Sequence, residues 1–166
     1  RKGAEVGVAV YRADEYTECC VSSTAVRRAI EAGDVGAAAL MLGREYTLSG
    51  KVVHGRALGR TIGFPTANID QTSTPCIVPA RGVYAVDIIL PDGGVHRAIM
   101  NIGHRPTVDN GSDDTLEVHV LDYNGDLYGQ TVVVKFLKRL RDERKFGSVE
   151  LLREQLAADA SAARTL

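Results

Sequence analysis

The hydrophobic and polar positions of this 166-residue chain follow two different periods. From residue 46 onward, apolar residues alternate with polar ones, as expected for strands with one buried face. Strands rich in β-branched residues are therefore predicted at residues 46–53, 82–90, 95–103, 115–122 and 131–140. Turn-forming sequences separate several of them, at residues 91–94, 109–114 and 123–126. Short strands at this spacing predict an antiparallel sheet that closes into a small barrel.

Before this strand-rich region, apolar residues recur at the spacing of an α-helix. A first helix is predicted to begin after Ser22 or Ser23, either of which can serve as its N-cap, and to end at Gly33. A second short helix is predicted to follow an N-cap at Asp34 and to end at Gly43. The apolar faces of the two helices consist of Val26, Ala29 and Ile30 and of Val35, Ala38, Ala39 and Leu42.

A last helix is predicted to follow an N-cap at Ser148. Its apolar stripe, which we expect to pack against the barrel, consists of Val149, Leu152 and Leu156. The chain then divides into residues 1–45, with a strand-like run at 5–10 and two helices, and residues 46–166, with the barrel and the last helix. The first part is too small to fold alone. Because the first residue is Arg, we expect the chain to be part of a larger protein.

Composition excludes several classes of partner. A net charge of −1 provides no positive surface for nucleic acid or an anionic membrane. The absence of Trp and an aromatic content of 5% argue against a base-stacking platform. The three cysteines form no CxxC pair and no disulfide framework, which favours a reducing cytosol. No apolar stretch approaches the length of a membrane span.

A glycine-rich stretch at residues 55–68 reads GRALGRTIGFPTAN. Its glycines are Gly55, Gly59 and Gly63. It matches neither a Walker loop nor a dinucleotide-binding fingerprint, so it could be a phosphate cradle or only a connector. Thr66 and Asn68 favour the cradle, because side chains two residues apart on an extended segment point to the same side. Both carry oxygen ligands suited to Mg²⁺ when phosphates supply the other positions.

The predicted strand at residues 115–122 carries a carboxylate among polar residues. Its two faces consist of Leu116, Val118 and Val120 and of Thr115, Glu117 and His119. A solvated outer face is the plainer interpretation of Glu117. A general base for an alcohol is the functional interpretation, provided that the polar face meets the glycine-rich stretch.

Other polar candidates have plain structural interpretations as well. Arg139, Arg141, Arg144 and Lys145 are candidates within the basic stretch KRLRDERKF. They could form a solvated face compensated by Asp142 and Glu143, or hold an anionic or planar ligand. The histidines, which lack paired metal-ligand spacing and are expected to be isolated polar residues, are His54, His96, His104 and His119. No zinc site is predicted, and Cys76 has no neighbouring residue in the sequence that would make it a nucleophile.

Several segments resemble riboflavin kinases in order and at normal spacing. They are GKVVHGRALGRTIGFPTANI, GVYAV, NIGHRPTV, LEVHVLDYNGDLYGQTVVVKFLKRLRDERKF and the last helix, over about residues 46–160. The pair GFPTAN and LDYNGDLYG is highly specific. Residues 21–44 resemble the end of the adenylyltransferase domain of bacterial bifunctional FAD synthetases. The resemblance therefore implies a kinase module that is covalently linked to an adenylyltransferase domain in the full-length protein.

The resemblance also implies a fold and an activity. The fold is a six-stranded antiparallel Greek-key barrel with a C-terminal helix, preceded by a helical remnant of an α/β nucleotidyltransferase domain. The activity is cytoplasmic, ATP- and Mg²⁺-dependent phosphorylation of the 5′-hydroxyl of riboflavin to FMN. By analogy, Thr66 and Asn68 hold Mg²⁺ and the phosphates, Glu117 is the catalytic base, and Arg141 contacts the flavin. The nucleotide flap is expected to contain Gly55, Gly59 and Gly63.

Two other classes of protein remain as alternatives. A non-catalytic flavin-binding barrel would bind FMN without ATP, although such a protein has no use for the metal ligands at Thr66 and Asn68. An interaction or oligonucleotide-binding barrel is disfavoured by the near-neutral charge and the few aromatic residues. The HxGH motif that FMN adenylylation needs does not occur in this sequence, so that activity is not expected of it.

Overall fold

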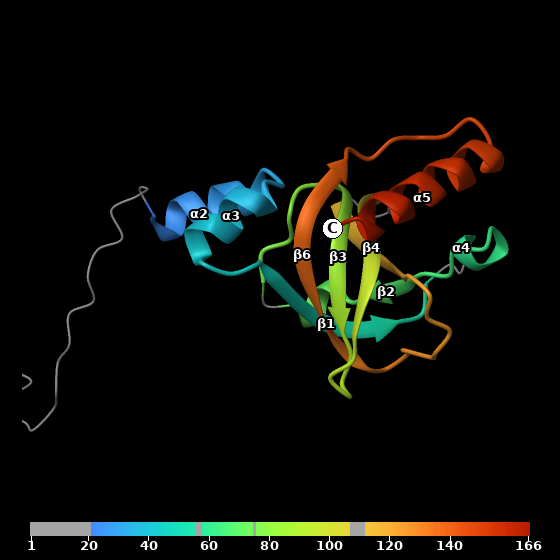
Figure 1. Cartoon of the computed structure of the whole chain (residues 1–166), viewed down its shortest axis with the longest axis horizontal. Coiled ribbons are helices and arrows are strands. Elements are labelled where there is room, and N and C mark those ends of the chain that lie inside the picture. The colour runs from blue at the N-terminus through green and yellow to red at the C-terminus, as the bar shows by residue number, and fades with distance from the viewer. Residues whose placement is uncertain (1–20, 56–57, 75, 107–111) are drawn as a thin grey trace, which may run out of the picture.

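The computed structural model describes residues 21–55, 58–74, 76–106 and 112–166. The strand-like run predicted at residues 5–10 lies outside these residues, as does part of the turn predicted at 109–114. A barrel occupies the centre of the described part, with helices α2 and α3 at one side and helix α5 lying across the outside of β3 and β4 (Figure 1).

The barrel is closed and all its strand pairs are antiparallel, in the order β1-β2-β5-β4-β3-β6. The strands are β1 (Thr47–Val53), β2 (Ala67–Ile69), β3 (Gly82–Ile89), β4 (Val95–Pro106), β5 (Ser112–Val120) and β6 (Thr131–Arg141). The connections from β2 to β3 and from β5 to β6 join strands that are not neighbours, as in Greek-key barrels. The predicted barrel is confirmed. Strand β2 escapes detection by alternation because three residues are too few to show a period.

The interior of the barrel is filled by alternate residues of every strand. Large side chains that are fully buried there include Leu48, Tyr84, Val86, Ile88, Met100, Ile102, Leu116, Val118 and Phe136. The rings of Tyr84 and Phe136 meet edge to face, with centroids 5.4 Å apart. Because Leu116 and Val118 point inward, Glu117 points to the outer surface of the barrel, as the alternation predicts.

Helices α2 (Ser23–Glu31) and α3 (Val35–Leu42) form the predicted pair at one side of the barrel. Ser22 and Asp34 cap them as expected, each accepting a hydrogen bond from a backbone N–H three residues on. The pair packs on the barrel, since Val35 joins the barrel core and the backbone N–H of Ala80 donates to the carbonyl of Ile30 at 3.3 Å.

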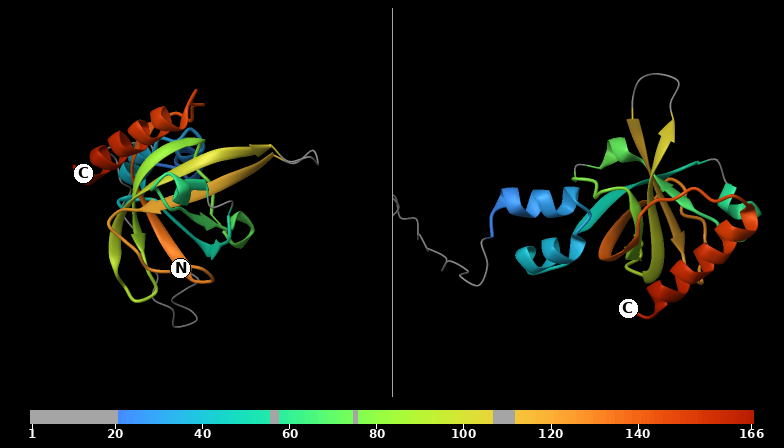
Figure 2. Two further views of the ribbon diagram at one scale, coloured as in Figure 1. Left: turned by 90° about the vertical axis from the view of Figure 1, so that its right-hand side faces the viewer. Right: turned by 90° about the horizontal axis from the view of Figure 1, so that it is seen from above.

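Helix α5 (Val149–Arg164) begins after the predicted N-cap, Ser148, and crosses the outside of the sheet (Figure 2). A second apolar cluster lies under it and consists of Ala85, Ile99, Leu121, Ala160 and Ala163, with Leu140 and Leu156 against them. Of the predicted apolar stripe, Leu156 packs on the barrel, and the contact begins there, about two turns after Val149. Val149 is 55% exposed, and the residues that contact the barrel follow Leu156 at intervals of four and three. The helix meets the sheet along its second half.

Candidate functional site

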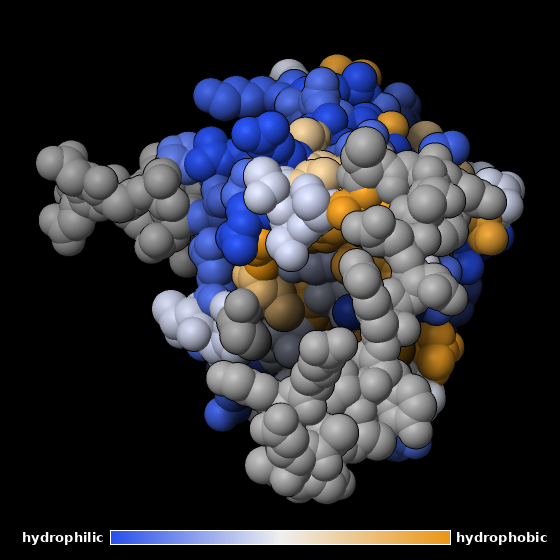
Figure 3. Space-filling model, turned by 90° about the vertical axis from the view of Figure 1, so that its left-hand side faces the viewer, coloured by the Kyte–Doolittle hydropathy of each residue, from blue (hydrophilic) through white to orange (hydrophobic). Residues whose placement is uncertain are grey.

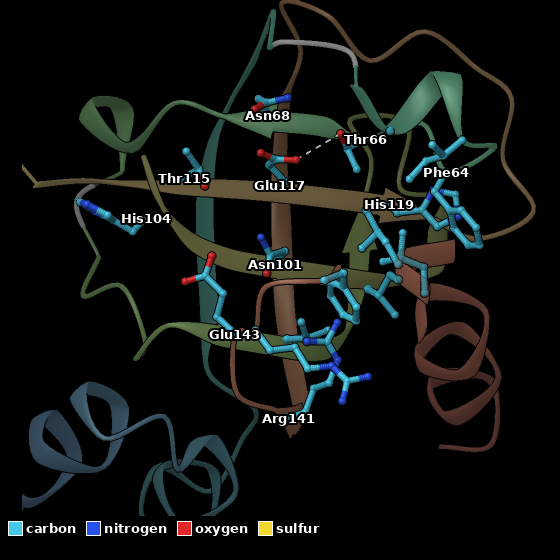
Figure 4. Close-up of a pocket in the computed structure, with 18 residues that line it drawn as sticks. Phe64, Thr66, Asn68, Asn101, His104, Thr115, Glu117, His119, Arg141 and Glu143 are labelled. Carbon is cyan, nitrogen blue, oxygen red and sulfur yellow. Dashed lines mark hydrogen bonds between the residues drawn. The ribbon is translucent and has the colours of Figure 1, made fainter. Parts of the chain in front are cut away.

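A row of side chains crosses adjacent strands on the outer surface of the barrel. On β5, Glu117 pairs in register with Asn68 of β2 on one side and with Asn101 of β4 on the other. Beyond Asn101 the row continues through Val83 of β3 to Arg141 of β6. All five residues line one cavity, and Figure 4 shows Asn68, Glu117 and Asn101 one below another. The closed barrel thus assembles residues that are far apart in the sequence.

This cavity has a volume of about 410 Å³. Its polar floor is the row on the barrel, together with Thr115. Its apolar walls come from the glycine-rich stretch, the loop after β6 and helix α5, and consist of Ile62, Phe64, Phe146, Leu152 and Leu156, with Ile99 beneath. A flat apolar molecule with one polar edge fits a slot of this kind.

Glu117 is half-buried at the floor of the cavity. The hydroxyl of Thr66, in the segment just before β2, donates to its Oε2 at 3.5 Å (Figure 4). The outer face that alternation assigns to Glu117 is therefore correct. However, α5 and the neighbouring loops turn that face into the floor of a pocket. The condition set for a functional Glu117, that its strand meets the glycine-rich stretch, is fulfilled in the structure.

A second cavity of about 530 Å³ opens on the other side of Thr66. It lies against Val118 and Val120, which point into the barrel, and is bordered by the loop at residues 123–128. The ring of Tyr128 in this loop stacks on His54 with centroids 3.8 Å apart. Thr66 lines both cavities and therefore stands where they meet.

The glycine-rich stretch lies beside this junction. A Cβ on Gly55 would come within 2.1 Å of the Nδ2 atom of Asn68, so the Asn68 amide rests directly on the Gly55 backbone. Gly63 has a φ of 83°, a conformation that favours glycine. Between them lies a one-turn helix, α4 (Leu58–Thr61), which the sequence pattern did not predict. Gly59 lines the first cavity, whereas Gly55 and Gly63 are not among the described residues that line it.

Arg141 lines the first cavity, and other groups of the protein engage all three of its nitrogens. Its Nε and Nη2 donate to the carboxylate of Asp159 on α5 at 2.7–3.1 Å, and its Nη1 donates to the backbone carbonyl of Asp142. Asp142 was predicted to compensate the positive charge of the basic stretch, and it does so for Arg139, with which it pairs at 2.9 Å. The partner of Arg141, in contrast, comes from another element. Its contact with a flavin stays a prediction.

Several cavity residues were not proposed as site residues from the sequence, among them Phe64, Asn101, His119 and Phe146. His119 shares the polar face of β5 with Glu117, and that shared face was the available signal. Its Nδ1 lies 2.7 Å from the carbonyl oxygen of Pro65, and its ring meets Phe64 edge to face at 5.1 Å. The expectation that the histidines are isolated is wrong for His119, and also for His54 and His96, whose rings contact tyrosines.

The side chains of Thr66 and Asn68 suit a metal ion that takes most of its coordinating atoms from a bound small molecule and few from the protein. Within the described ranges, no group of three or more His, Cys, Asp or Glu side chains could hold an ion by itself. The Thr66 hydroxyl and the Asn68 amide carbonyl are hard oxygen donors, which suit Mg²⁺. An ion at this place would therefore take most of its ligands from phosphates.

The closed barrel carries two cavities that share Thr66 in their linings, and the carboxylate of Glu117 lies beside Thr66 in the first of them. The sequence model of riboflavin kinase matches residues 42–166, and the chain belongs to the riboflavin kinase family. Over 144 residues, the chain is 43% identical to the bifunctional riboflavin kinase/FMN adenylyltransferase of Haemophilus influenzae. This match covers 87% of the chain and 46% of the relative, so the chain spans about half the length of that protein.

Solved structures share the fold. A structure described as a macrolide-efflux protein from Streptococcus pneumoniae superposes with a TM-score of 0.81 at 42% identity, covering 88% of this chain and 47% of that one. Riboflavin kinase from Trypanosoma brucei superposes with a TM-score of 0.50 at 28% identity, covering 72% and 77%. The name of the first structure, a macrolide-efflux protein, describes a different kind of protein from the riboflavin kinase family that matches this chain. Within the described residues, none of the helices is both long and apolar enough to cross a membrane.

Proposed function

We propose that this chain transfers the terminal phosphate of ATP to the 5′-hydroxyl of riboflavin, giving FMN and ADP. The observation that carries the proposal is the position of Thr66, which lines both cavities and donates to Glu117 at 3.5 Å. Phosphoryl transfer requires a donor and an acceptor to meet in line at one point, and two cavities that both border on Thr66 suit such a meeting.

The lining of the two cavities suggests which substrate each one takes. The first has apolar walls and a polar floor, which suit the isoalloxazine ring and the ribityl chain of riboflavin. The second contains Tyr128 and Tyr123 beside polar loop residues, which suit an adenine ring and a ribose. With this arrangement the ribityl hydroxyl lies near Glu117, and the phosphates lie near Thr66 and Asn68.

Glu117 would act as the general base. A carboxylate within hydrogen-bond reach of the attacking hydroxyl can accept its proton as the oxygen–phosphorus bond forms and the bond to the ADP oxygen breaks. The Thr66 hydroxyl and the Asn68 amide, both from the segment that runs beside Glu117, would orient the phosphates. Glycine backbone N–H groups at Gly55, Gly59 and Gly63 would complete the phosphate surroundings.

Thr66 and Asn68 would hold Mg²⁺ together with the phosphates. The ion, when bound, supplies positive charge that offsets the charge developing between the β- and γ-phosphates. The protein's own contribution is to fix the two oxygen donors, and the contact between Gly55 and the Asn68 amide does this for one of them.

Residues 1–45 are proposed to be the end of an adenylyltransferase domain, which joins the kinase module in the bifunctional relative from Haemophilus influenzae. The side of the molecule that carries α2 and α3 mixes hydrophobic with hydrophilic residues (Figure 3), and Leu40 of α3 is 81% exposed. A cytoplasmic location agrees with the few cysteines.

The decisive experiment is to incubate the purified chain with riboflavin and Mg·ATP and to separate the products by chromatography. We expect equal amounts of FMN and ADP, and no FMN when ATP is omitted. Riboflavin or FMN binding without ATP-dependent turnover would instead establish the alternative, a flavin-binding barrel without catalysis.

A further inference from the structure

Asp159 is a buried charged residue that the proposed reaction does not use. It lies on the inner side of α5 and is 4% exposed. Its carboxylate accepts hydrogen bonds from Nε and Nη2 of Arg141, and a further one from Nε2 of Gln155 at 2.6 Å. A charge buried to this extent is favourable only when it is paired and hydrogen-bonded, and Asp159 is both.

The bonds of Asp159 continue to a second arginine through Gln155. The side-chain oxygen of Gln155 accepts a hydrogen bond from Nη2 of Arg144, while its amide nitrogen donates to Asp159. One turn of α5, from Gln155 to Asp159, therefore holds both Arg141 and Arg144.

Both arginines contact an aromatic ring of the cavity wall. The guanidinium carbon of Arg144 lies 4.8 Å from the centroid of the Phe146 ring, and that of Arg141 lies 5.7 Å from it. Phe146, Arg141 and Arg144 all line the first cavity. The loop at residues 142–147, between β6 and Ser148, has no helix or strand of its own. Contacts from α5 therefore set the place of Phe146.

We infer that Asp159 and Gln155 are positioning residues for the flavin site. They hold Arg141 and Arg144 against α5, and the arginines hold Phe146 as one wall of a slot that exists before the flavin enters. The role of Arg141 that follows is to connect α5 with the cavity wall. This inference rests on the proposed function, because it takes the first cavity as the flavin site.

Changes in this wall are expected to affect riboflavin binding and to spare ATP binding. The second cavity shares none of these residues, and within the described part of the chain none of them is hydrogen-bonded to Glu117. Loosening the wall should therefore weaken riboflavin binding and raise its KM, and should leave the KM for ATP unchanged. The turnover number at saturating riboflavin should also change little.

The test compares Gln155→Met and Asp159→Asn with the wild-type chain. The first variant keeps side-chain length and helix propensity while it removes both bonds, and the second keeps shape while it removes the charge. Arg164→Ala serves as the control, because Arg164 pairs with Asp122 near the other end of α5, where both side chains are exposed. The readouts are the riboflavin Kd from flavin fluorescence without ATP, both KM values, kcat and the melting temperature.

We expect each variant to raise the Kd and KM for riboflavin about tenfold, since hydrogen bonds to charged groups have effects of that order. The ATP KM should stay within about twofold, and the control should match the wild type. Wild-type riboflavin Kd and KM in Gln155→Met would overturn the inference, even if Asp159→Asn failed to fold. An equal rise in both KM values would also overturn it, because that result would indicate a general loss of structure and not a loss of the flavin wall. A wild-type chain that binds riboflavin but forms no FMN would refute the proposed function, and the Kd comparison would still decide the inference.

Discussion

The hydroxyl of Thr66 donates to Oε2 of Glu117 at 3.5 Å, across 51 residues of sequence. The two residues are brought together because β2 pairs with β5 and Thr66 directly precedes β2. The contact joins the two sequence motifs that suggested a kinase, and it lies where the two cavities meet.

Replacing Glu117 by Gln should lower kcat by about 10²–10⁴-fold, the usual contribution of a general base. Riboflavin binding, measured by fluorescence, should stay near the wild-type value because the shape of the floor is kept. Asp114→Asn is a matched control, since Asp114 lies on the same strand and pairs with Arg81 outside both cavities. A Glu117→Gln variant with near-native turnover would show that another group accepts the proton.

Replacing Thr66 by Ala should raise the KM for Mg·ATP about tenfold and shift the Mg²⁺ dependence of the rate to higher concentration. Thr66→Ser should behave much like the wild type, because it keeps the hydroxyl. The measurement is a two-dimensional titration of ATP and Mg²⁺. If the metal dependence of Thr66→Ala were unchanged, Thr66 would not belong to the metal site.

Replacing Tyr128 by Ala should weaken nucleotide binding and spare flavin binding. Tyr128 lines the second cavity, and its ring stacks on His54. Its loss removes a surface on which the adenine can stack, and such stacking contributes roughly 1–3 kcal/mol to binding. ADP affinity by calorimetry and riboflavin affinity by fluorescence separate the two substrates. A loss of riboflavin affinity with intact ADP affinity would reverse the assignment of the cavities.

Replacing Gly55 by Ala should displace the Asn68 amide, because the new Cβ would lie 2.1 Å from its Nδ2. We expect kcat/KM for Mg·ATP to fall by about 10–100-fold, as for other small misplacements of a positioning group. Gly36→Ala in helix α3 is the control, since the nearest atom to its added Cβ is 3.6 Å away. Equal activity of the two variants would mean that the place of Asn68 is not important for turnover.

Stability should fall at alkaline pH because of Tyr46. Burial, followed by the nearby Cys76, raises the pKa of Tyr46 from 10.0 to about 12, and its hydroxyl donates to the carbonyl of Ile77 at 2.7 Å. Below pH 10.0 the hydroxyl is protonated in the folded and the unfolded chain. As pH rises from 10.0 towards about 12, only the unfolded chain loses the proton, so the free energy of unfolding decreases.

The check is urea unfolding of the wild type and of Tyr46→Phe between pH about 8 and about 11. The variant should start about 1 kcal/mol less stable, through the lost hydrogen bond, and should decline less steeply. Some decline should persist, because burial also raises the pKa of Tyr84. Parallel curves for the two proteins would mean that Tyr46 titrates alike in both states.

Local signals in the sequence determined most of the secondary structure of this protein. In the part of the chain that the structure describes, alternation located five of the six strands, and the caps at Ser22, Asp34 and Ser148 located the start of three helices. These features depend on residues within one or two turns of one another, so they can be detected in a short window. Alternation also placed Glu117 on the outer face, and the PTAN motif supplied Thr66 and Asn68 as candidates.

Only the tertiary structure decided which of those residues meet. The row from Asn68 through Glu117 and Asn101 to Arg141 exists because the closed barrel sets strands β2, β5, β4, β3 and β6 side by side. Strand order depends on pairing between distant segments, for which a single sequence has no local signal. The same reason explains Asp159, whose partner Arg141 lies 18 residues earlier on another element. Alternation showed that Glu117 faces outward, and the packing of α5 and the loops made that outward face a site.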